Sequence, residues 1–302
     1  MAKVRGRESV GVVSVNYQAQ EQLCRCLASL KEHCLGEELH FIVVDNSPVS
    51  EIDRIRRRHP EIQAICPGRN LGFAGGCNLG IARALNQGLD YVLLLNPDTR
   101  TEHDFIRVLL DQLAQDPARA MAGPKILRDN AQRAVWYGGA RMNWWLGGPR
   151  QEMDHRHDGA GEAQTVPCLS GCAMLITASA IRQVGRMAEG YFLYYEDTDY
   201  VQRFLRAGLT VVYCPAAGLL HDVSSTIGLH SPAYVYYFSR NRVWFMRRWA
   251  RWYHFMVFML YNTVVKLPGA FLIFALKKRR PALVWAYWKG YWHGIRGYRE
   301  RL

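Results

Sequence analysis

Short apolar runs alternate with amphipathic segments along the first 115 residues. The runs predict strands at residues 10–15, 41–44, 62–66 and 91–95, and the amphipathic segments predict helices at 21–30, 51–58, 75–86 and 102–115. Regular strand–helix alternation favours an α/β fold in which helices flank a mostly parallel sheet. Ligands of such sheets bind beyond the carboxyl ends of the strands, so the residues that follow each strand are the first candidates for a site.

The pattern is lost in the middle of the chain and then returns. Residues 129–167 are rich in Gly, His and charged side chains and show no periodicity, which predicts a long mobile loop rather than a second core. A strand at 172–177, a helix at 197–207 closed by Gly208 and a strand at 209–214 follow.

From residue 240 onward the pattern is that of a helical extension. Residues 253–276 are strongly apolar but are interrupted by Asn262, Lys266 and Pro268. A helix that spans a bilayer needs about 20 consecutive apolar residues. The two pieces are shorter, so the pattern predicts an interfacial helical hairpin, and the alternative is a helix pair buried against the preceding domain.

Charge strengthens the case for a membrane surface. Of the formal net charge of +12, residues 240–302 contribute fourteen Lys or Arg against one acidic residue, together with six of the nine Trp. Residues 1–239 are close to neutral, with 24 basic and 25 acidic side chains. Trp beside Arg and Lys is typical of a lipid–water interface, and the basic cluster 277–280 and the aromatic helix at 282–292 favour anionic headgroups.

The cysteines and the N-terminal residues indicate the cellular compartment in which the protein is expected. The eight Cys form no C-x-x-C pair, which argues against a zinc cluster or a redox site. We expect them to be reduced thiols in a cytosolic protein, and no secretory signal pattern precedes Val10.

Polar residues follow three of the predicted strands. Asn16 follows the first strand, Asp45 the second, and Asn96 and Asp98 the fourth. Such residues are common in turns. Polar residues that follow three strands at one edge of the sheet nevertheless favour a ligand-binding site. Asp98 suits a divalent cation that also contacts phosphate oxygens, and the alternative is that it caps the helix that follows.

A glycine-rich stretch at residues 70–80 follows the third predicted strand and opens a helix. Its backbone amides can approach an anion closely at a helix N-terminus. The stretch matches neither the G-x-G-x-x-G fingerprint nor a P-loop, and the alternative is a tight strand–helix turn.

Three carboxylates stand within four positions after an aromatic run: Glu196, Asp197 and Asp199. One or two acids would satisfy a helix N-terminus, where each charge stabilises by about 0.3–1 kcal/mol. A carboxylate beside aromatics and another carboxylate has a raised pKa, which suits a general base. His221 lies after the strand at 209–214, at the same edge as Asp98, and is a candidate metal ligand.

Several runs occur together in the order and spacing of a known family. They are Ser14-Val15-Asn16-Tyr17, Val43-Val44-Asp45-Asn46-Ser47, Asn70-Leu71-Gly72-Phe73-Ala74-Gly75-Gly76, Leu95-Asn96-Pro97-Asp98, Ser170-Gly171-Cys172-Ala173-Met174-Leu175 and Phe192-Leu193-Tyr194-Tyr195-Glu196-Asp197-Thr198-Asp199. With Arg203, Ala207-Gly208 and His221, they resemble the family 2 glycosyltransferases of the GT-A fold, specifically the rhamnosyltransferase-like branch, over about residues 10–245.

The resemblance implies a role for each matching position. The implied nucleotide-sugar-binding residues are Asn16, Asp45, Asn70, Gly72, Gly75, Gly76, Asn78 and Asn96. Asp98 and His221 would hold Mg²⁺ or Mn²⁺ on the diphosphate of a UDP- or dTDP-sugar. Asp197 would be the catalytic base, and Glu196, Asp199 and Glu189 would support it or position the acceptor.

The resemblance also implies an organisation and a setting. Residues 1–239 would form the GT-A domain, with a nucleotide-sugar half at about 1–125 and an acceptor half at about 165–239, and residues 240–302 would form a membrane-associating tail. The expected reaction inverts the anomeric carbon of a sugar, for which the family suggests rhamnose, on a lipid-linked or cell-envelope glycan. The enzyme would be cytoplasmic, peripheral or monotopic on the inner face of the cell membrane.

Two other function classes remain open. The cationic aromatic tail fits single-stranded nucleic acid, but the apolar runs at 257–260 and 271–274 do not suit a groove in water, so we expect no nucleic-acid partner. A nucleotidyltransferase on a similar fold would carry Arg or Lys near the first strand, and residues 14–20 carry neither.

Overall fold

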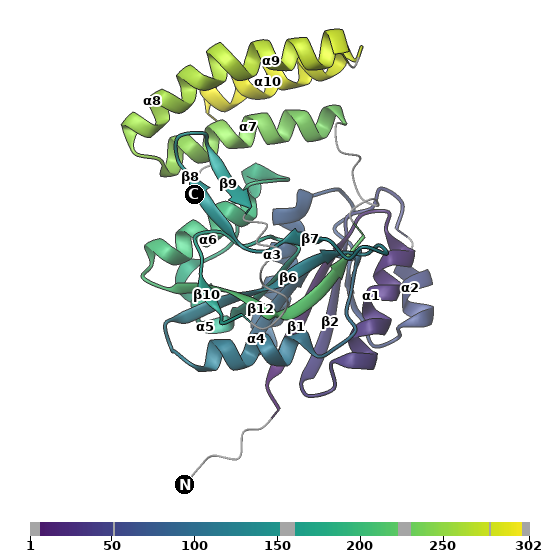
Figure 1. Ribbon diagram of the computed structural model, residues 1–302. Helices are drawn as coiled ribbons and strands as arrows, with labels where there is room; N and C mark the ends of the chain where they lie inside the picture. Colours follow the sequence, from purple (N-terminus) through teal and green to yellow (C-terminus); the bar gives the residue numbers. More distant parts are fainter. Residues whose placement is uncertain (1–6, 51, 152–160, 223–230, 278, 298–302) are drawn as a thin grey trace.

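The computed structural model describes residues 7–50, 52–151, 161–222, 231–277 and 279–297 (Figure 1). The strands are β1 (Ser9–Asn16), β2 (Glu38–Asp45), β3 (Gln63–Ile65), β4 (Tyr91–Leu95), β5 (Thr99–Arg100), β6 (Arg119–Arg128), β7 (Val135–Tyr137), β8 (Ala140–Asn143), β9 (Gly148–Gln151), β10 (Gln164–Thr165), β11 (Ala173–Thr177) and β12 (Thr210–His221). The α-helices are α1 (Gln20–His33), α2 (Ile52–Arg58), α3 (Gly72–Asn86), α4 (Phe105–Ala114), α5 (Ala178–Val184), α6 (Glu196–Arg206), α7 (Pro232–Trp249), α8 (Trp252–Tyr261), α9 (Leu267–Phe271) and α10 (Pro281–Arg296).

One mixed sheet forms the centre of the molecule. Its strand order is β10-β12-β6-β11-β4-β1-β2-β3, with β5 added to β12 and β7 added to β6. Strands β3, β2, β1 and β4 are parallel neighbours, as are β6 and β12, whereas β11 is antiparallel to both β4 and β6. The expected α/β fold is therefore confirmed, and its antiparallel pairings lie in the second half of the chain.

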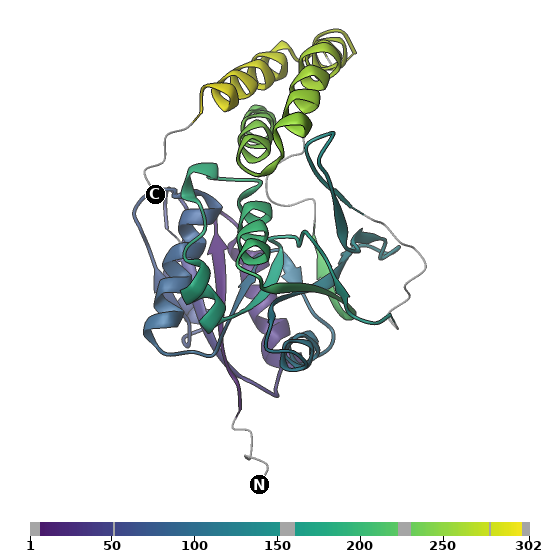
Figure 2. The same ribbon diagram turned by 90° about the vertical axis from the view of Figure 1, so that its left-hand side faces the viewer.

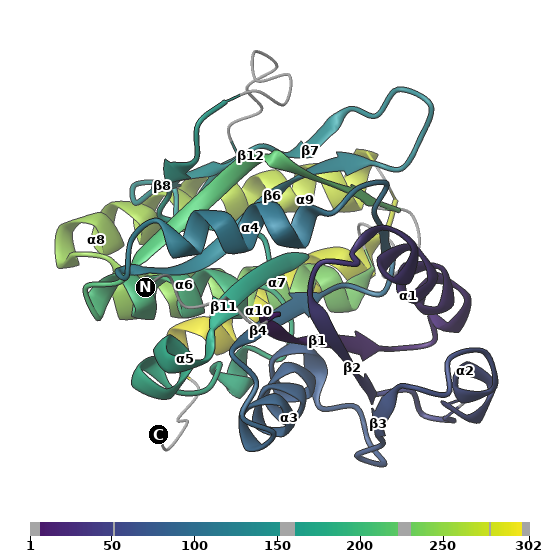
Figure 3. The same ribbon diagram turned by 90° about the horizontal axis from the view of Figure 1, so that it is seen from below.

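Alternation along the strands builds a core on each face of the sheet. In β4, Leu93 and Leu95 point into the core shared with α1, α2 and α4, and Val92 and Leu94 point into the core shared with α3, α5 and α6. Figure 3 shows α4 on one side of the sheet and α3 and α5 on the other. Both faces of β4 are buried because helices cover both sides of the sheet, which explains its continuous apolar sequence.

Two sequence-based expectations about the middle of the chain were wrong. Residues 129–167 are not one long loop, because β7, β8, β9 and β10 lie within them, and residues 152–160 lie outside the described part. These strands have two to four residues each, too few to show a period. The strand expected at 209–214 continues to His221. The sequence did not show this continuation, because register shifts against β6 at Cys214/Gly218 interrupt the alternation of side chains along the strand.

The C-terminal helices form a separate layer over the α/β domain (Figures 1 and 2). Helices α8 and α9 join through the π-helical turn Asn262–Lys266, and a second such turn, Leu272–Lys277, follows α9, so that they give one apolar helix, Trp252–Leu276. The break expected at Pro268 was therefore wrong: the helix continues through Pro268, which lies between the two π turns, where the regular α-helical hydrogen-bond pattern is already altered. The hairpin is instead made by this helix and α10.

This layer exposes a large apolar surface. Among the described residues, Trp252–Leu276 is the one helix long and apolar enough to cross a bilayer, by length and composition alone, and 17% of its most apolar window is buried. Its exposed side chains include Trp252, Leu260, Val264, Phe271, Leu272 and Leu276. On α10, Trp285, Trp288 and Trp292 are exposed and stacked in a row. The alternative of a helix pair buried against the domain does not describe this surface.

Candidate active site

The first two strands end in a buried polar pair. Asn16 and Asp45 are register partners at the ends of β1 and β2. Asn16 Nδ2 donates to Asp45 Oδ1 at 2.9 Å, Ser47 N donates to the same oxygen at 3.2 Å, and Ser50 Oγ donates to Asp45 Oδ2 at 2.5 Å. The strand exits therefore converge as expected, and three donors fix the direction of the Asp45 carboxylate.

The start of the glycine-rich stretch joins two distant parts of the chain. Asn70 Oδ1 accepts from Gly72 N at 2.8 Å, Gly72 O accepts from Asn46 Nδ2 at 2.8 Å, and Phe73 N donates to Phe192 O at 2.7 Å. Gly72 has φ +73°, and a Cβ there would lie 2.4 Å from Phe192 O. Only glycine permits this approach, which holds the glycine-rich stretch against the segment before α6.

The later glycines of this stretch pack α3 onto β1. A Cβ at Gly76 would lie 2.7 Å from Val15, and a Cβ at Gly75 would lie 2.8 Å from Leu71 within the same loop. Asn78 is buried, and its amide pairs with Met187 N and O and donates to Glu189 Oε1 at 2.8 Å. The structure thus gives Gly76 and Asn78 packing contacts that the resemblance did not include.

Asp98 and His221 meet at the carboxyl end of β4. The two-residue strand β5 pairs antiparallel with the end of β12 and brings His221 opposite Thr99. His221 Nε2 lies 3.1 Å from Asp98 Oδ1, and both side chains are buried. Asp98 does not cap the next helix, because Asp104 Oδ1 accepts from Arg107 N at the start of α4.

The donor set at this pair fits a hard divalent cation. Two ligands at about 2.1 Å from one octahedral ion lie about 3 Å apart, which matches the separation of the oxygen and the nitrogen. Among the described residues, no group of three or more His, Cys, Asp or Glu could hold a metal. Mg²⁺ sites commonly use one or two protein ligands and complete the shell with substrate phosphates and water. Asp98 and His221 would be the protein's share of such a shell, one carboxylate oxygen and one imidazole nitrogen.

The three clustered carboxylates at the start of α6 differ sharply in environment. Glu196 and Asp199 are buried, and Asp197 is the one of the three that is partly exposed. Asp197 Oδ1 accepts from Thr198 N at 2.6 Å and from Thr198 Oγ1 at 3.1 Å, and Oδ2 accepts from Gly171 N at 2.9 Å. Asp197 is thus the carboxylate that can reach a substrate from a fixed position.

Burial determines the protonation of this cluster. Burial raises the pKa of Asp197, and its hydrogen bonds act in the opposite direction. Burial also raises the pKa of Glu196 well above 4.5, and the charges of Asp197 and Asp199 raise it further. Glu196 Oε2 has no hydrogen-bond partner among the described residues. Burial therefore favours the neutral form of Glu196 more strongly than that of Asp197, whose carboxylate accepts three hydrogen bonds.

Asp199 lies at the joint between α6 and α7. Its Oδ1 accepts from Trp249 Nε1 at 2.8 Å and from Tyr191 Oη at 3.2 Å. Arg203 Nε is 3.3 Å from Oδ2, and an Arg248 nitrogen is 3.5 Å from Oδ1. The side chain is fully buried, so the structure gives Asp199 a role in holding α7 to the domain rather than contact with an acceptor.

Two residues that sequence reasoning did not select hold the segment before α6. Arg240 and Asn241, both buried on α7, donate to backbone carbonyls of residues 190–194. The sequence pattern identified these two residues only as part of the cationic, aromatic tail. The one signal that could have identified it is an Asn on the apolar face of a helix, which needs a buried partner.

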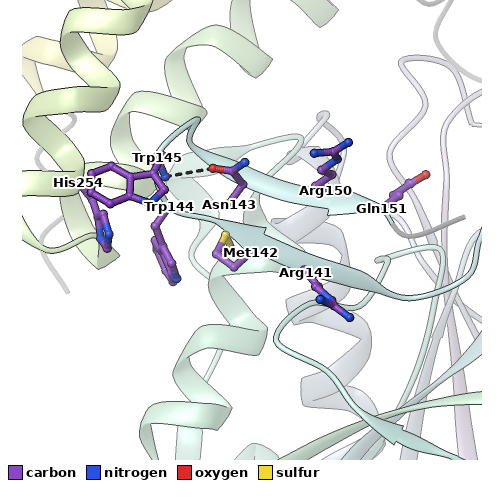
Figure 4. A pocket seen from close by; sticks show the side chains of 8 residues that line it. All are labelled: Arg141, Met142, Asn143, Trp144, Trp145, Arg150, Gln151 and His254. Atoms are coloured by element: carbon purple, nitrogen blue, oxygen red, sulfur yellow. Dashed lines mark hydrogen bonds between the residues drawn. The ribbon is translucent and has the colours of Figure 1, made fainter.

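A pocket of about 610 Å³ lies between the β8–β9 hairpin and the start of α8 (Figure 4). Its lining residues are Arg141, Met142, Asn143, Trp144, Trp145, Arg150, Gln151 and His254. The hairpin turn contacts both the segment before α6 and α7, since Tyr195 Oη and Arg242 Nε of α7 donate to Gly147 O, at 3.1 and 2.9 Å. No site residue expected from the sequence lines this pocket.

Comparison with known proteins identifies the family. Residues 9–185, more than half of the chain, match the model of glycosyl transferase family 2. The chain belongs to this family. It is therefore a glycosyltransferase, and the resemblance read from the sequence motifs is confirmed. A nucleic-acid-binding protein and a nucleotidyltransferase are not supported.

Characterised relatives share most of the length of this glycosyltransferase. It is 29% identical over 278 residues to the N-acetylglucosaminyl-diphospho-decaprenol L-rhamnosyltransferase of Mycobacterium tuberculosis, covering 80% of this chain and 87% of that one. It is 25% identical over 249 residues to the dTDP-rhamnosyl transferase RfbF of Shigella flexneri, covering 80% of both chains. The low-salt glycan biosynthesis hexosyltransferase Agl10 of Haloferax volcanii is 26% identical over 227 residues, 71% of this chain and 67% of that one.

A solved structure supports the GT-A fold. The crystal structure of GalNAc-T7 with UDP, GalNAc and Mn²⁺ superposes with a TM-score of 0.66 at 14% sequence identity, over 91% of this chain. This chain spans 54% of the length of that one. The likeness shows the fold.

Proposed function

We propose that this glycosyltransferase inverts the anomeric carbon while it moves a sugar from a UDP- or dTDP-sugar to a hydroxyl of a lipid-linked or cell-envelope glycan. One observation carries the proposal: the residues just before β11 contact both the turn that leads to Asp98 and the carboxylate of Asp197. Asn96 N donates to Cys172 O at 2.9 Å, and the neighbouring Gly171 N donates to Asp197. The metal-side turn at Asp98 and the base therefore lie on either side of one short segment.

The proposed chemistry at Asp197 follows from its hydrogen bonds. Oδ1 accepts two donors and Oδ2 one, so Oδ2 has the more available lone pair. In the proposed step, Asp197 Oδ2 takes the proton of the acceptor hydroxyl as its oxygen bonds to the anomeric carbon. The bond from that carbon to the diphosphate oxygen breaks on the opposite face, and the nucleoside diphosphate leaves with the electron pair.

Asp98 and His221 would hold Mg²⁺ or Mn²⁺ on the donor diphosphate. A divalent ion there supplies Lewis-acid stabilisation of the charge on the departing diphosphate. The structural neighbour was crystallised with Mn²⁺ and UDP, which supports a metal of this kind. Asn16 and Asp45, buried and hydrogen-bonded to one another at the ends of β1 and β2, would shape the nucleobase side by holding the loops that follow these strands.

The relatives guide the choice of donor and acceptor. Two of them are named as rhamnosyltransferases, one with a dTDP donor and one with a diphospho-decaprenol acceptor. We therefore rank dTDP-rhamnose first among donors and a diphosphate-linked lipid first among acceptors. The pocket beside α8 would take the anionic diphosphate, because Arg141 and Arg150 line it and the exposed apolar helix begins at its rim.

The C-terminal layer would hold the enzyme on the inner face of the cell membrane. Its exposed apolar side chains and Trp row would enter the interface, and its Lys and Arg would each add about 1 kcal/mol near an anionic surface. Co-sedimentation with vesicles tests this: binding should be stronger to vesicles with anionic lipid and should weaken in Trp285→Ser with Trp288→Ser. Equal binding by that variant would contradict the placement.

Transfer by the purified full-length protein tests the proposed function. UDP- and dTDP-sugars would be screened with Mg²⁺ or Mn²⁺ and a lipid-diphosphate acceptor, with Asp98→Ala, Asp197→Asn and the exposed control Asp53→Asn in parallel. Metal-dependent release of UDP or dTDP should disappear in the first two variants and persist in the control. Full transfer by Asp197→Asn would overturn the role of the base, and metal-independent transfer would overturn the role of Asp98.

A further inference from the structure

The segment that leads into α6 has a backbone that L-residues rarely adopt. Phe192, Tyr194 and Tyr195 have φ values of +64°, +69° and +72°. For bulky residues this conformation is costly, and it persists only where the surrounding structure holds it. Tyr195 is the residue that precedes α6, so this strained segment sets the position of the carboxylates that follow it.

One side chain of α7 lies within hydrogen-bonding distance of three backbone carbonyls of this segment. Asn241 Nδ2 lies 2.9 Å from Tyr191 O, 2.8 Å from Leu193 O and 2.8 Å from Tyr194 O. The side chain has no exposed surface. A single buried amide thus takes the place of the solvent that these carbonyls would otherwise need.

Arg240 completes the contact and orients the amide. Its Nη2 donates to Gly190 O at 2.7 Å and to Tyr191 O at 2.8 Å, and its Nε donates to Asn241 Oδ1 at 2.8 Å. With the Oδ1 engaged by a donor, the Nδ2 of Asn241 must face the carbonyls. The two residues therefore act as one unit.

We propose that Arg240 and Asn241 are positioning residues for sugar transfer, which hold the segment 190–195 so that Asp197 stands at the correct distance from the donor. This inference rests on the proposed function. The same segment contacts the glycine-rich stretch, which would line the donor, through Phe192 O and Phe73 N, at 2.7 Å. Holding it therefore fixes the base and the donor loop relative to one another.

The opposite face of α7 is covered by α10. A Cβ at Gly294 of α10 would lie 2.7 Å from Arg240 O, and a Cβ at Gly290 would lie 2.1 Å from Ser239 Oγ. These glycines let α10 lie directly on α7. The pair thus connects the apolar C-terminal layer on one side with the segment before α6 on the other, and its buried side chains direct their donors to backbone carbonyls, which suits a positioning role.

The test separates positioning from a general loss of structure. Asn241→Ala removes the donors, Arg240→Lys keeps a charge but loses the fork of donors, and Asn262→Ala is the matched control. Asn262 is also a buried Asn that donates to a backbone carbonyl, Phe258 O at 2.8 Å, but it lies in the C-terminal layer away from the segment 190–195.

Three measurements on the full-length protein decide the outcome: thermal unfolding, kcat for transfer, and donor Kd by calorimetry. Asn241→Ala should lower kcat by about 100-fold, the loss that follows a misplacement of about 1 Å, with donor Kd within about twofold. Arg240→Lys should lie between it and the wild type, and Asn262→Ala should lose stability but keep kcat. If Asn241→Ala cannot be obtained folded, Arg240→Lys carries the comparison.

Two results would overturn the inference. One is a folded Asn241→Ala with wild-type kcat, and the other is a fall in kcat matched by an equal fall in donor affinity or by the same fall in Asn262→Ala. Failure of the proposed function would look different, because the wild type itself would then show no transfer with any donor.

Discussion

The carboxylate of Asp199 is the joint between α6 and α7, and replacing it should measure the strength of that joint. Two neutral groups donate to it, Trp249 Nε1 and Tyr191 Oη, and two partly exposed arginines, Arg203 and Arg248, lie within 3.5 Å. All of the carboxylate surface is buried. Asp199→Ala removes an acceptor from four groups at once.

The magnitude follows from these contacts. A hydrogen bond to a charged group contributes about 1.5–3 kcal/mol, and two such bonds are lost. The contact of the partly exposed Arg248 adds less than about 1 kcal/mol. Arg203 Nε is buried, so the alanine variant also leaves this nitrogen without its charged partner, which is a further cost. We therefore expect Asp199→Ala to lower the free energy of unfolding by at least about 3 kcal/mol, and Asp199→Asn, which keeps an acceptor oxygen, to lower it by about half as much. For a chain of this size that is a fall in Tm of at least roughly 6 °C for the alanine variant.

Thermal unfolding followed by circular dichroism measures the effect. Asp53→Ala is the control, because the Asp53 side chain is exposed and its ion pair with Arg56 is long, at 3.7 Å. A Tm for Asp199→Ala within about 1 °C of that control would refute the reasoning. If Asp199→Asn instead keeps its Tm and raises the KM for the acceptor, the acceptor-positioning role suggested by the sequence motif is the correct one.

Three further predictions concern the donor loop, the buried acid and the acceptor pocket. Gly72→Ala should cost at least about 2 kcal/mol more than Gly68→Ala, because both glycines have a left-handed φ but only Gly72 faces an obstacle, Phe192 O; equal unfolding free energies would contradict this. Because the pKa of Glu196 is raised in the folded protein, its stabilising contribution is complete below pH 4.5 and is lost as the pH rises through the folded pKa. Glu196→Gln should therefore be more stable than the wild type at pH 8 but not at pH 4, as measured by denaturant titration. The reverse trend would exclude a buried neutral acid. Arg150→Glu should raise the KM for a lipid-diphosphate acceptor by about tenfold, which corresponds to 1.4 kcal/mol, and leave donor hydrolysis unchanged; an equal rise for an acceptor without phosphate would exclude the pocket as the diphosphate site.

Local sequence predicted the parts of the molecule in which neighbours in the chain are also neighbours in space. The strand β4 was predicted to the residue, because both of its faces are apolar and turn residues bound it. The strand exits at Asn16 and Asp45 were predicted to meet, because parallel strands end at one edge. The position of Asp197 at the start of α6 followed from its motif.

Contacts between distant segments escaped sequence reasoning. Nothing near Asn241 in the sequence shows that its partners lie about fifty residues earlier, in a segment whose strain comes from tertiary contacts. The burial of Asp199 was hidden for the same reason, since two of its partners belong to α7. The continuity of the helix through Pro268 depends on π turns, which leave no periodic signal.

The place of β11 in the sheet has a consequence for how the chain is made. β4 is completed on one side by β1, which precedes it, and on the other by β11, which is synthesised about eighty residues later. Until then, a nascent chain that ends near residue 125 carries the apolar strand β4 as an unpaired edge, a template for aggregation. The donor-binding half is therefore not a separable folding module. We expect a fragment of residues 1–125 to be insoluble and the slowest productive step of synthesis to be the insertion of β11 between β4 and β6.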